Sequence, residues 1–302
     1  MATTKSWIKA ARPRTLPLAL SGILTGCGVA WFYGVIDALV CVLAIVTATF
    51  IQIFSNFAND YGDSRKGTDN AFRVGPARTV QAGEISLREM EKGMIILGTL
   101  SLLFGIWLVY AGTWHSSQTA FFIFIGLGIL SLLAAYFYTS GTHSYGYIGL
   151  GDLAVFLFFG LLPVSGVFFL NSGFMTAAVL LPAVSIGLFS TGVLNLNNMR
   201  DIENDRRCGK ITIPVRLGER PSRIYHLCLI GGAWLTAIVF TGWQFRSGWQ
   251  WLFLLSLPLF LTDMVRIYRI SEAAALDPFL KRLSLSTLTF TLLFCIGLIL
   301  AI

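Results

Sequence analysis

Long apolar stretches alternate with polar connections along the whole chain of 302 residues. Nine of these stretches approach the roughly 20 residues that an α-helix needs to cross a bilayer. They cover approximately 15–34, 36–57, 94–112, 118–139, 150–170, 175–196, 224–243, 249–268 and 283–302. None alternates apolar and polar positions as a strand of a membrane barrel does. The pattern therefore predicts an all-α polytopic membrane protein with nine transmembrane helices.

The composition agrees with this prediction and excludes other classes of protein. Apolar residues make up 55% of the chain and charged residues only 12%, whereas soluble domains contain about 25% charged residues. A soluble globule, a disordered chain and a coiled coil are therefore excluded. The five cysteines are scattered and form no CxxC pair, so neither a disulfide framework nor a zinc site is predicted.

Basic residues are confined to alternate connections between the apolar stretches. Of the 22 Lys and Arg residues, 21 lie in the N-terminal segment or around the connections after the second, sixth and eighth stretches, and Arg246 is the exception. With nine helices, all these segments lie on one face. The positive-inside rule then places the N-terminus and both long loops in the cytoplasm. The net charge of +7 follows from this asymmetry, and no nucleic-acid partner is predicted. The expected location is the cell (inner or plasma) membrane.

Two of the basic connections share an acidic pattern: Asn-x3-Asp, a second Asp three or four residues later, a basic pair and a glycine. The first contains Asn56, Asn59, Asp60, Asp63, Arg65, Lys66, Gly67 and Asp69. The second contains Asn197, Asp201, Asp205, Arg206, Arg207, Gly209 and Lys210. Asp60 and Asp201 are 141 residues apart, with four predicted helices between them. An even number of helices returns the chain to the same face of the membrane, as in a parallel internal repeat. We therefore expect one domain over 1–302 with repeat-like halves at about 1–140 and 141–282 and an extra helix at 283–302.

The spacing of these acids indicates a metal site. Residues four apart share one face of a helix, so each motif lines up carboxylates at the cytoplasmic end of a helix. Two such stripes facing one cavity carry too much negative charge to remain unpaired. Magnesium suits such oxygen ligands and is often shared with substrate phosphates. Nearby Arg and Lys side chains are also suited to phosphate oxygens. The pattern predicts a membrane-embedded site for a diphosphate held through Mg²⁺.

A membrane transporter is the competing interpretation, because internal repeats and intramembrane acids are also transporter features. Transporter acids usually lie in the middle of helices, however. Those of this chain lie at helix ends beside basic pairs, which favours an enzyme.

Several motifs resemble those of the UbiA superfamily of intramembrane prenyltransferases, and within it the branch that prenylates 1,4-dihydroxy-2-naphthoate. The segments that carry the resemblance are 12–17, 59–63, 67–69, 75–78, 147–152, 197–205 and 215–218. The four-residue spacing of the acids in the second motif fits this branch better than the 4-hydroxybenzoate branch. Homologues that use 4-hydroxybenzoate, homogentisate or haem remain alternatives.

The resemblance implies a Mg²⁺-dependent reaction in the bilayer. A polyprenyl group passes from polyprenyl diphosphate to 1,4-dihydroxy-2-naphthoate, which loses its carboxylate, and demethylmenaquinone is formed for menaquinone biosynthesis. The resemblance assigns catalysis to Asp60, Asp63, Asp201 and Asp205. These four and Asp69, whose role is the least defined, are the expected metal ligands. We expect a set of basic and amide side chains to bind the diphosphate: Asn56, Asn59, Arg65, Lys66, Arg73, Arg78, Asn197, Arg206 and Lys210. The acceptor is expected at Asp152, Arg200 and Arg216. The histidines His115, His143 and His226 share no spacing and are not predicted to be catalytic.

Overall fold

The computed structural model describes residues 2–70, 73–113, 117–142 and 144–302; His115 and His143 lie outside them. Within these residues, nine helical segments are long and apolar enough to cross a membrane, which confirms the predicted number. The first seven elements are α1 (Thr4–Ala11), η1 (Pro13–Thr15), α2 (Leu16–Phe32), α3 (Ala38–Lys66), α4 (Leu87–Thr113), α5 (Gln118–Phe137) and η2 (Tyr145–Tyr147). They are followed by α6 (Gly151–Val155), η3 (Phe156–Leu161), α7 (Leu162–Ser172), η4 (Ala177–Val179), α8 (Leu180–Arg200), α9 (Ile202–Arg207) and α10 (Ile213–Leu217). The last five are α11 (Glu219–Trp243), η5 (Gly248–Ser256), α12 (Leu257–Arg269), η6 (Ala273–Leu276) and α13 (Asp277–Ile299).

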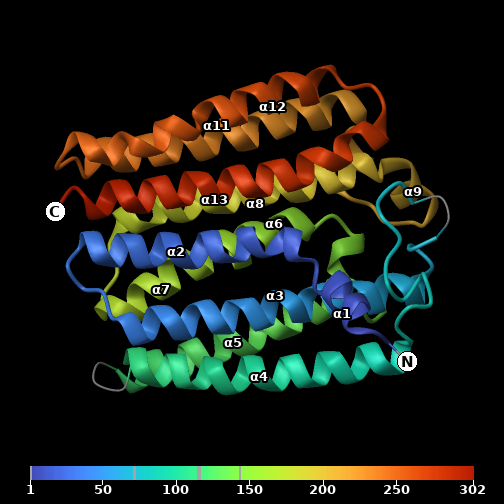
Figure 1. The fold of residues 1–302 in the computed structure, drawn as a ribbon, viewed down its shortest axis with the longest axis horizontal. Coiled ribbons are helices and arrows are strands. Elements are labelled where there is room, and N and C mark those ends of the chain that lie inside the picture. Colours follow the sequence, from blue (N-terminus) through green and yellow to red (C-terminus); the bar gives the residue numbers. More distant parts are fainter. Residues whose placement is uncertain (1, 71–72, 114–116, 143) are drawn as a thin grey trace.

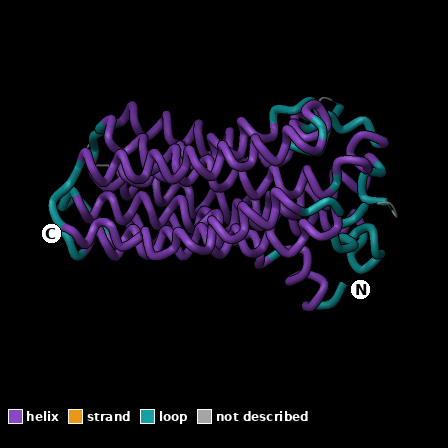
Figure 2. Tube along the Cα trace, turned by 90° about the horizontal axis from the view of Figure 1, so that it is seen from above, coloured by secondary structure: helices purple, strands orange, loops and turns teal. Residues whose placement is uncertain are grey.

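The long helices run side by side along the longest axis of the molecule (Figure 1). Helices α11 and α12 form one edge, α8 and α13 lie beside them, and α3, α4 and α5 form the opposite edge. Helix α2 lies between these groups and packs on α3, α7 and α13. The view from above shows the same parallel arrangement, with loops gathered at the two ends (Figure 2).

The ends of the molecule differ sharply in charge. The N-terminus lies at the same end as the segments 67–86 and 201–218, and the C-terminus lies at the other end. The segments that hold 21 of the 22 basic residues are therefore at one end, as nine spans require. Which side of the membrane this end faces stays a prediction, as does the division into repeat-like halves.

The helices extend beyond the apolar stretches at the charged end. Helix α3 continues nine residues past position 57 and stops at Gly67, whose φ of 73° lies in the left-handed region that favours glycine. Helix α8 continues to Arg200, where a break separates it from the short helix α9. Apolar composition marks the part of a helix inside hydrocarbon, whereas capping residues determine where the helix stops. The polar motifs therefore lie mostly on helices rather than in loops.

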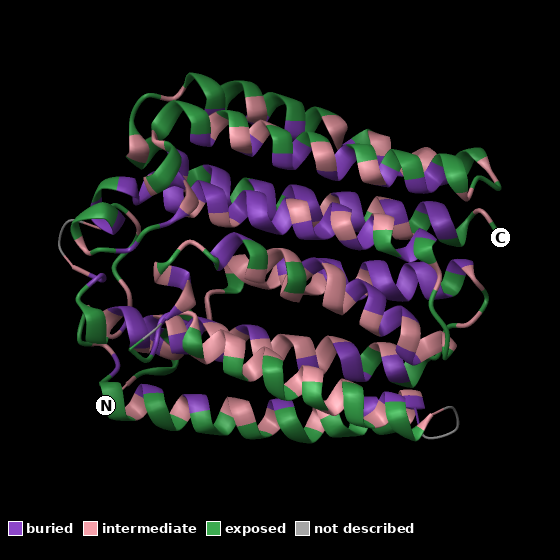
Figure 3. Cartoon of the chain, turned by 180° about the vertical axis from the view of Figure 1, so that it is seen from behind, coloured by how far each residue is buried: buried purple, intermediate pink, exposed green. Residues whose placement is uncertain are grey.

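Close backbone contacts and aromatic packing form the interior. A side chain at Gly160 would place its Cβ 2.3 Å from the Cα of Gly187, so η3 and α8 approach too closely at this point for any residue larger than glycine. Helix α8 is the most buried of the long helices, as the burial colouring shows (Figure 3). Its Phe189 ring packs against the rings of Trp234 in α11 and Phe290 in α13. Many of the 24 Phe residues thus serve packing or face outward.

Candidate active site

The first acidic motif occupies the last turns of α3. Asn56, Asp60 and Asp63 follow at intervals of four and three residues, and all three are buried. The chain reverses after Gly67, so that the amide of Asp69 comes 3.4 Å from the carbonyl oxygen of Asp63. The reversal places Asp69, which is also buried, beside the other two acids. The helical spacing expected from the sequence is therefore present, and the turn supplies the third carboxylate.

The second acidic motif lies across the break between α8 and α9. Asp201 occupies the break itself, and its carbonyl oxygen accepts a hydrogen bond of 2.8 Å from the amide of Asp205. The predicted four-residue register therefore persists through an interruption that the spacing did not reveal. Both carboxylates are buried, as those of the first motif are.

The two motifs lie against each other although they are far apart in the sequence. The side-chain amide of Asn204 donates a hydrogen bond of 3.0 Å to the carbonyl oxygen of Thr68. The guanidinium of Arg73 lies 3.5 Å from Asp69 of the first motif and 3.8 Å from Asp201 of the second. The structure thus brings the two acidic segments into one cluster, as the repeated pattern predicts.

Arg78 is the cationic centre of this cluster. Its guanidinium lies 3.1 Å from Asp63, 3.2 Å from Asp69 and 3.8 Å from Asp60. On the other side of the cluster, the ammonium of Lys210 lies 3.6 Å from Asp205. Ion pairs therefore partly neutralise the carboxylates and leave basic groups in place beside them.

Burial sets the proton affinities of the acids outside the spans. It raises the pKa of Asp69 to about 6, against the opposing charge of Arg78. It also raises the pKa of Asp205 to about 6, against the charge of Lys210. For Asp201, burial is outweighed by the hydrogen bond and charge of Arg200, so its pKa lies below the ordinary value.

Three residues that the sequence interpretation did not assign to the site contact these acids. Arg12 lies 3.4 Å from Asp60, and the hydroxyl of Thr79 donates a hydrogen bond of 2.6 Å to the same carboxylate. The hydroxyl of Tyr147 donates a hydrogen bond of 2.8 Å to Asp63. Arg12 and Tyr147 belong to motifs that carried the resemblance, so the sequence could have pointed to both as site residues. Nothing in the sequence singles out Thr79.

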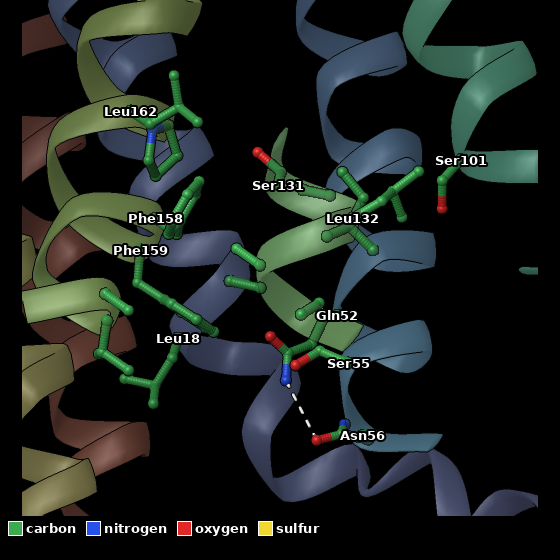
Figure 4. Close-up of a pocket in the computed structure, with 18 of the residues that line it drawn as sticks. Leu18, Gln52, Ser55, Asn56, Ser101, Ser131, Leu132, Phe158, Phe159 and Leu162 are labelled. Atoms are coloured by element: carbon green, nitrogen blue, oxygen red, sulfur yellow. Dashed lines mark hydrogen bonds between the residues drawn. The ribbon is translucent and has the colours of Figure 1, made fainter. Parts of the chain in front are cut away.

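A cavity of about 420 Å³ extends from this cluster between the helices. Its charged end is lined by Asp63, Arg73, Arg78 and Lys210, and the rest of its wall is mostly apolar. Figure 4 shows polar side chains of α3, with Gln52 donating a hydrogen bond of 3.4 Å to Asn56, opposite the aromatic ring of Phe159. A ligand with a charged head and an apolar tail matches this distribution of polarity.

The residues predicted to bind a diphosphate divide into two groups. Lining the cavity are Asn56, Asn59, Arg73, Arg78, Asn197 and Lys210. Outside its wall are Arg65, Lys66 and Arg206. Arg65 lies over the ring of Tyr61, and Arg206 forms an exposed ion pair of 2.6 Å with Glu203. The ammonium of Lys66 lies 4.3 Å from the ring centroid of Tyr147.

None of the three residues predicted for the acceptor lines the cavity. The carboxylate of Asp152 accepts a hydrogen bond of 3.0 Å from Tyr225 of α11. Arg200 is fully buried in ion pairs with Asp201 at 2.6 Å and Asp277 at 2.5 Å. The exposed Arg216 donates a hydrogen bond of 2.6 Å to the carbonyl oxygen of Ile148. These contacts fix the loops and helices around the site. His226 is buried on α11 and also lies outside the cavity wall.

The acidic cluster has the donor chemistry of a divalent-cation site. Among the described residues, no three acidic, histidine or cysteine side chains converge closely enough to form a ready-made metal site, because arginines lie between the acids. Yet in the described part of the chain one carboxylate oxygen each of Asp69 and Asp205 is buried without a hydrogen-bond donor, and the other oxygen of Asp69 has only ion-pair contacts with Arg73 and Arg78. Such oxygens are the ligands that magnesium prefers, so these residues fit the predicted ion.

Known proteins are similar in sequence to this chain over nearly its whole length. The chain is 44% identical over 298 residues to 1,4-dihydroxy-2-naphthoate octaprenyltransferase of Escherichia coli, covering 99% of this chain and 96% of that protein. It is 41% identical to the protein of the same name from Haemophilus influenzae, covering 98% and 96%.

Solved structures share the fold at low sequence identity. A UbiA homologue from Aeropyrum pernix superimposes with a TM-score of 0.65 at 17% identity, covering 90% of this chain and 96% of that one. A UbiA homologue from Archaeoglobus fulgidus bound to DMAPP and Mg²⁺ gives 0.54 at 17% identity, covering 93% and 98%. The family model of UbiA prenyltransferases matches residues 19–300. The chain belongs to the UbiA prenyltransferase family.

Proposed function

We propose that this protein transfers a polyprenyl group from polyprenyl diphosphate to 1,4-dihydroxy-2-naphthoate, with loss of the acceptor carboxylate as carbon dioxide. The allylic C–O bond to the diphosphate breaks, a C–C bond to the aromatic ring forms, and demethylmenaquinone is the product. The observation that carries the proposal is the cavity whose charged end is lined by side chains of both acidic motifs, Asp63 of the first and Asn197 and Lys210 of the second, and whose wall is otherwise mostly apolar. The near full-length identity to two naphthoate octaprenyltransferases supports the choice of acceptor.

The acidic cluster is the proposed site of the metal. Asp60, Asp63, Asp69, Asp201 and Asp205 would hold Mg²⁺. When bound, the ion neutralises charge on the diphosphate leaving group. A UbiA homologue of the same fold was solved bound to DMAPP and Mg²⁺, which supports the choice of this ion.

The chain's own residues supply binding and protection. Arg73, Arg78 and Lys210 line the charged end and are placed to bind phosphate oxygens, because guanidinium and ammonium groups make strong charge-assisted hydrogen bonds. The apolar wall excludes water from an allylic cation. Phe158 and Phe159, which also line the cavity, present aromatic rings of the kind that attract cations.

The tail of the donor extends beyond the cavity. A volume of about 420 Å³ is typical of a pocket for a small organic ligand, for which the range is about 300–1,000 Å³. We infer that it holds the reacting isoprene units and the acceptor, while the rest of a long prenyl chain lies in the bilayer. Such a chain needs no enclosed tunnel, because lipid tails are as apolar as the cavity wall.

The charged end faces the cytoplasm in this proposal, and the protein lies in the cell (inner or plasma) membrane. The positive-inside rule supports this orientation, because 21 of the 22 basic residues belong to segments at that end. The site then opens toward the compartment in which a water-soluble acceptor dissolves.

The orientation gives a labelling prediction. In a variant without the five native cysteines, Glu203→Cys should react with an impermeant thiol reagent only from the cytoplasmic side. Glu203 is exposed on α9. Ser172 is the last residue of α7 and lies at the opposite end of the molecule from α9. Ser172→Cys should therefore react only from the other side of the membrane. Inside-out and right-side-out vesicles provide the two measurements. Labelling of both positions from one side would contradict the nine-span orientation.

The acceptor is tested by offering several aromatic acids with one prenyl diphosphate. We expect 1,4-dihydroxy-2-naphthoate to be prenylated and 4-hydroxybenzoate to be a poor substrate. Carbon dioxide labelled at the naphthoate carboxylate should be released in step with the prenylated product, which mass spectrometry identifies. Efficient turnover of 4-hydroxybenzoate or homogentisate without turnover of the naphthoate would reject this acceptor but keep a prenyltransferase. No consumption of prenyl diphosphate with any acceptor would favour a transporter.

A further inference from the structure

The basic residues that line the cavity differ in whether they have an acidic partner. They are Arg12, Arg14, Arg73, Arg78, Lys210 and Lys281. Four of them are paired with carboxylates of the two acidic motifs. The other two, Arg14 and Lys281, form no ion pair with any carboxylate in the described ranges. Asp277, one turn before Lys281, is the acid whose charge acts most strongly on Arg14, but the two form no ion pair and Asp277 is held by Arg200 at 2.5 Å.

Arg14 and Lys281 come from opposite ends of the chain but lie on packed elements. The carbonyl oxygen of Arg14 in η1 accepts a hydrogen bond of 3.1 Å from the hydroxyl of Ser284 in α13. Ser284 follows Lys281 by three residues, so both lie on one face of α13. The two cations therefore border the cavity at the junction of η1 and α13. Arg14 is half-buried and Lys281 is exposed, which leaves them open to an anion that enters from the aqueous side.

Two leucines adjoin the two cations in the cavity wall. Leu18, one turn after Arg14, and Leu280, next to Lys281, also line the cavity, and both are buried. A flat aromatic ring in the cavity beside these leucines would lie against apolar side chains. An acidic group on that ring would lie next to two positive charges. The pair is also separate from Arg73, Arg78 and Lys210, which are engaged with the acidic motifs.

We propose that Arg14 and Lys281 form the subsite that binds the carboxylate of the aromatic acceptor. The inference rests on the proposed function and deepens it. It replaces the expectation that Arg200 and Arg216 bind the acceptor, because neither of those side chains lines the cavity. The two residues are positioning residues: they hold the acceptor with its ring toward the allylic end of the donor.

The test is equilibrium binding of 1,4-dihydroxy-2-naphthoate to the full-length protein in detergent, measured for the wild type, Arg14→Gln and Lys281→Gln. Each substitution should raise the Kd about tenfold to hundredfold, the loss expected for one hydrogen bond to a charged group. The Kd for 1,4-dihydroxynaphthalene, which lacks the carboxylate, should not change. Arg14→Lys should retain most of the affinity because it retains the charge. Arg269→Gln, which removes an exposed cation of α12 outside the cavity wall, is the matched control.

Turnover separates failure of this subsite from failure of the proposed function. In active enzyme the KM for the naphthoate should rise with the Kd, while the KM for prenyl diphosphate stays constant. An unchanged Kd for the naphthoate in both variants would overturn the subsite. A rise in the KM for prenyl diphosphate alone would also overturn it, because the cations would then bind the donor. Wild-type protein that binds the naphthoate through these residues but never prenylates it would retain the subsite and reject the proposed function.

Discussion

Asp60→Ala and Asp201→Ala should each lower turnover about 100- to 1,000-fold, the loss typical of removing a group that stabilises charge in a transition state. The two acids come from different motifs, yet Arg73 forms ion pairs with Asp69 of the first motif and Asp201 of the second, which joins both motifs in one cluster. Neither motif should therefore compensate for the other. The measurement is prenyl transfer by purified protein in detergent at saturating donor and acceptor.

Controls must separate catalysis from folding, because removal of one partner of a buried ion pair costs about 3–5 kcal/mol. Asp60→Asn keeps the volume of the side chain and an oxygen that accepts the hydrogen bond from Thr79, and it should be as inactive as Asp60→Ala while melting closer to the wild-type temperature. Glu203→Ala removes an exposed acid of α9 close to Asp201 and Asp205 and should retain activity. Normal turnover in either alanine variant of the clustered acids would contradict a site built from both motifs.

Chelation of divalent cations should abolish measurable turnover, and addition of Mg²⁺ should restore it. The proposed ligands are carboxylate oxygens, and the buried oxygens of Asp69 and Asp205 that lack a hydrogen-bond donor favour a hard cation. The assay follows product formation after exhaustive EDTA treatment and during back-titration with Mg²⁺. Circular dichroism of the chelated protein should be unchanged, because in the described residues the helices are joined by packing and by the protein's own ion pairs. Full activity after chelation would exclude the metal.

The balance of charge in the cluster explains why metal and diphosphate are expected together. Arginines Arg73 and Arg78 already neutralise much of the negative charge of the acids. A divalent cation alone would add positive charge next to these guanidinium groups. A diphosphate brings negative charge that both the cation and the arginines can share. We therefore expect the affinity for Mg²⁺ to rise when prenyl diphosphate is present.

The sequence by itself determined the number of spans of this protein and the presence of an acidic site. Hydrocarbon accepts only backbone whose hydrogen bonds are satisfied internally and few charges, so apolar length along the chain translates directly into nine spans. Charged residues avoid hydrocarbon, so the basic residues also indicated that the long polar connections lie together at one end of the molecule. The spacing of Asp60 and Asp63 also predicted a shared helix face, since a single helix fixes the relation between neighbouring turns.

Only the tertiary structure decided which charged side chains reach the cavity. Arg65 and Arg78 belong to the same connection, yet Arg65 lies against Tyr61 and Arg78 contacts three carboxylates. Spacing along one helix gives no information about how that helix is rotated against its neighbours or where a loop returns, because those depend on packing between distant segments. Arg14 and Lys281 lie 267 positions apart in the sequence, and the packing of η1 on α13 brings both of them to the wall of one cavity. Local periodicity therefore set the shared face of Asn56, Asp60 and Asp63 on α3, whereas the meeting of the two motifs and the cations that border the cavity were set by how distant segments pack.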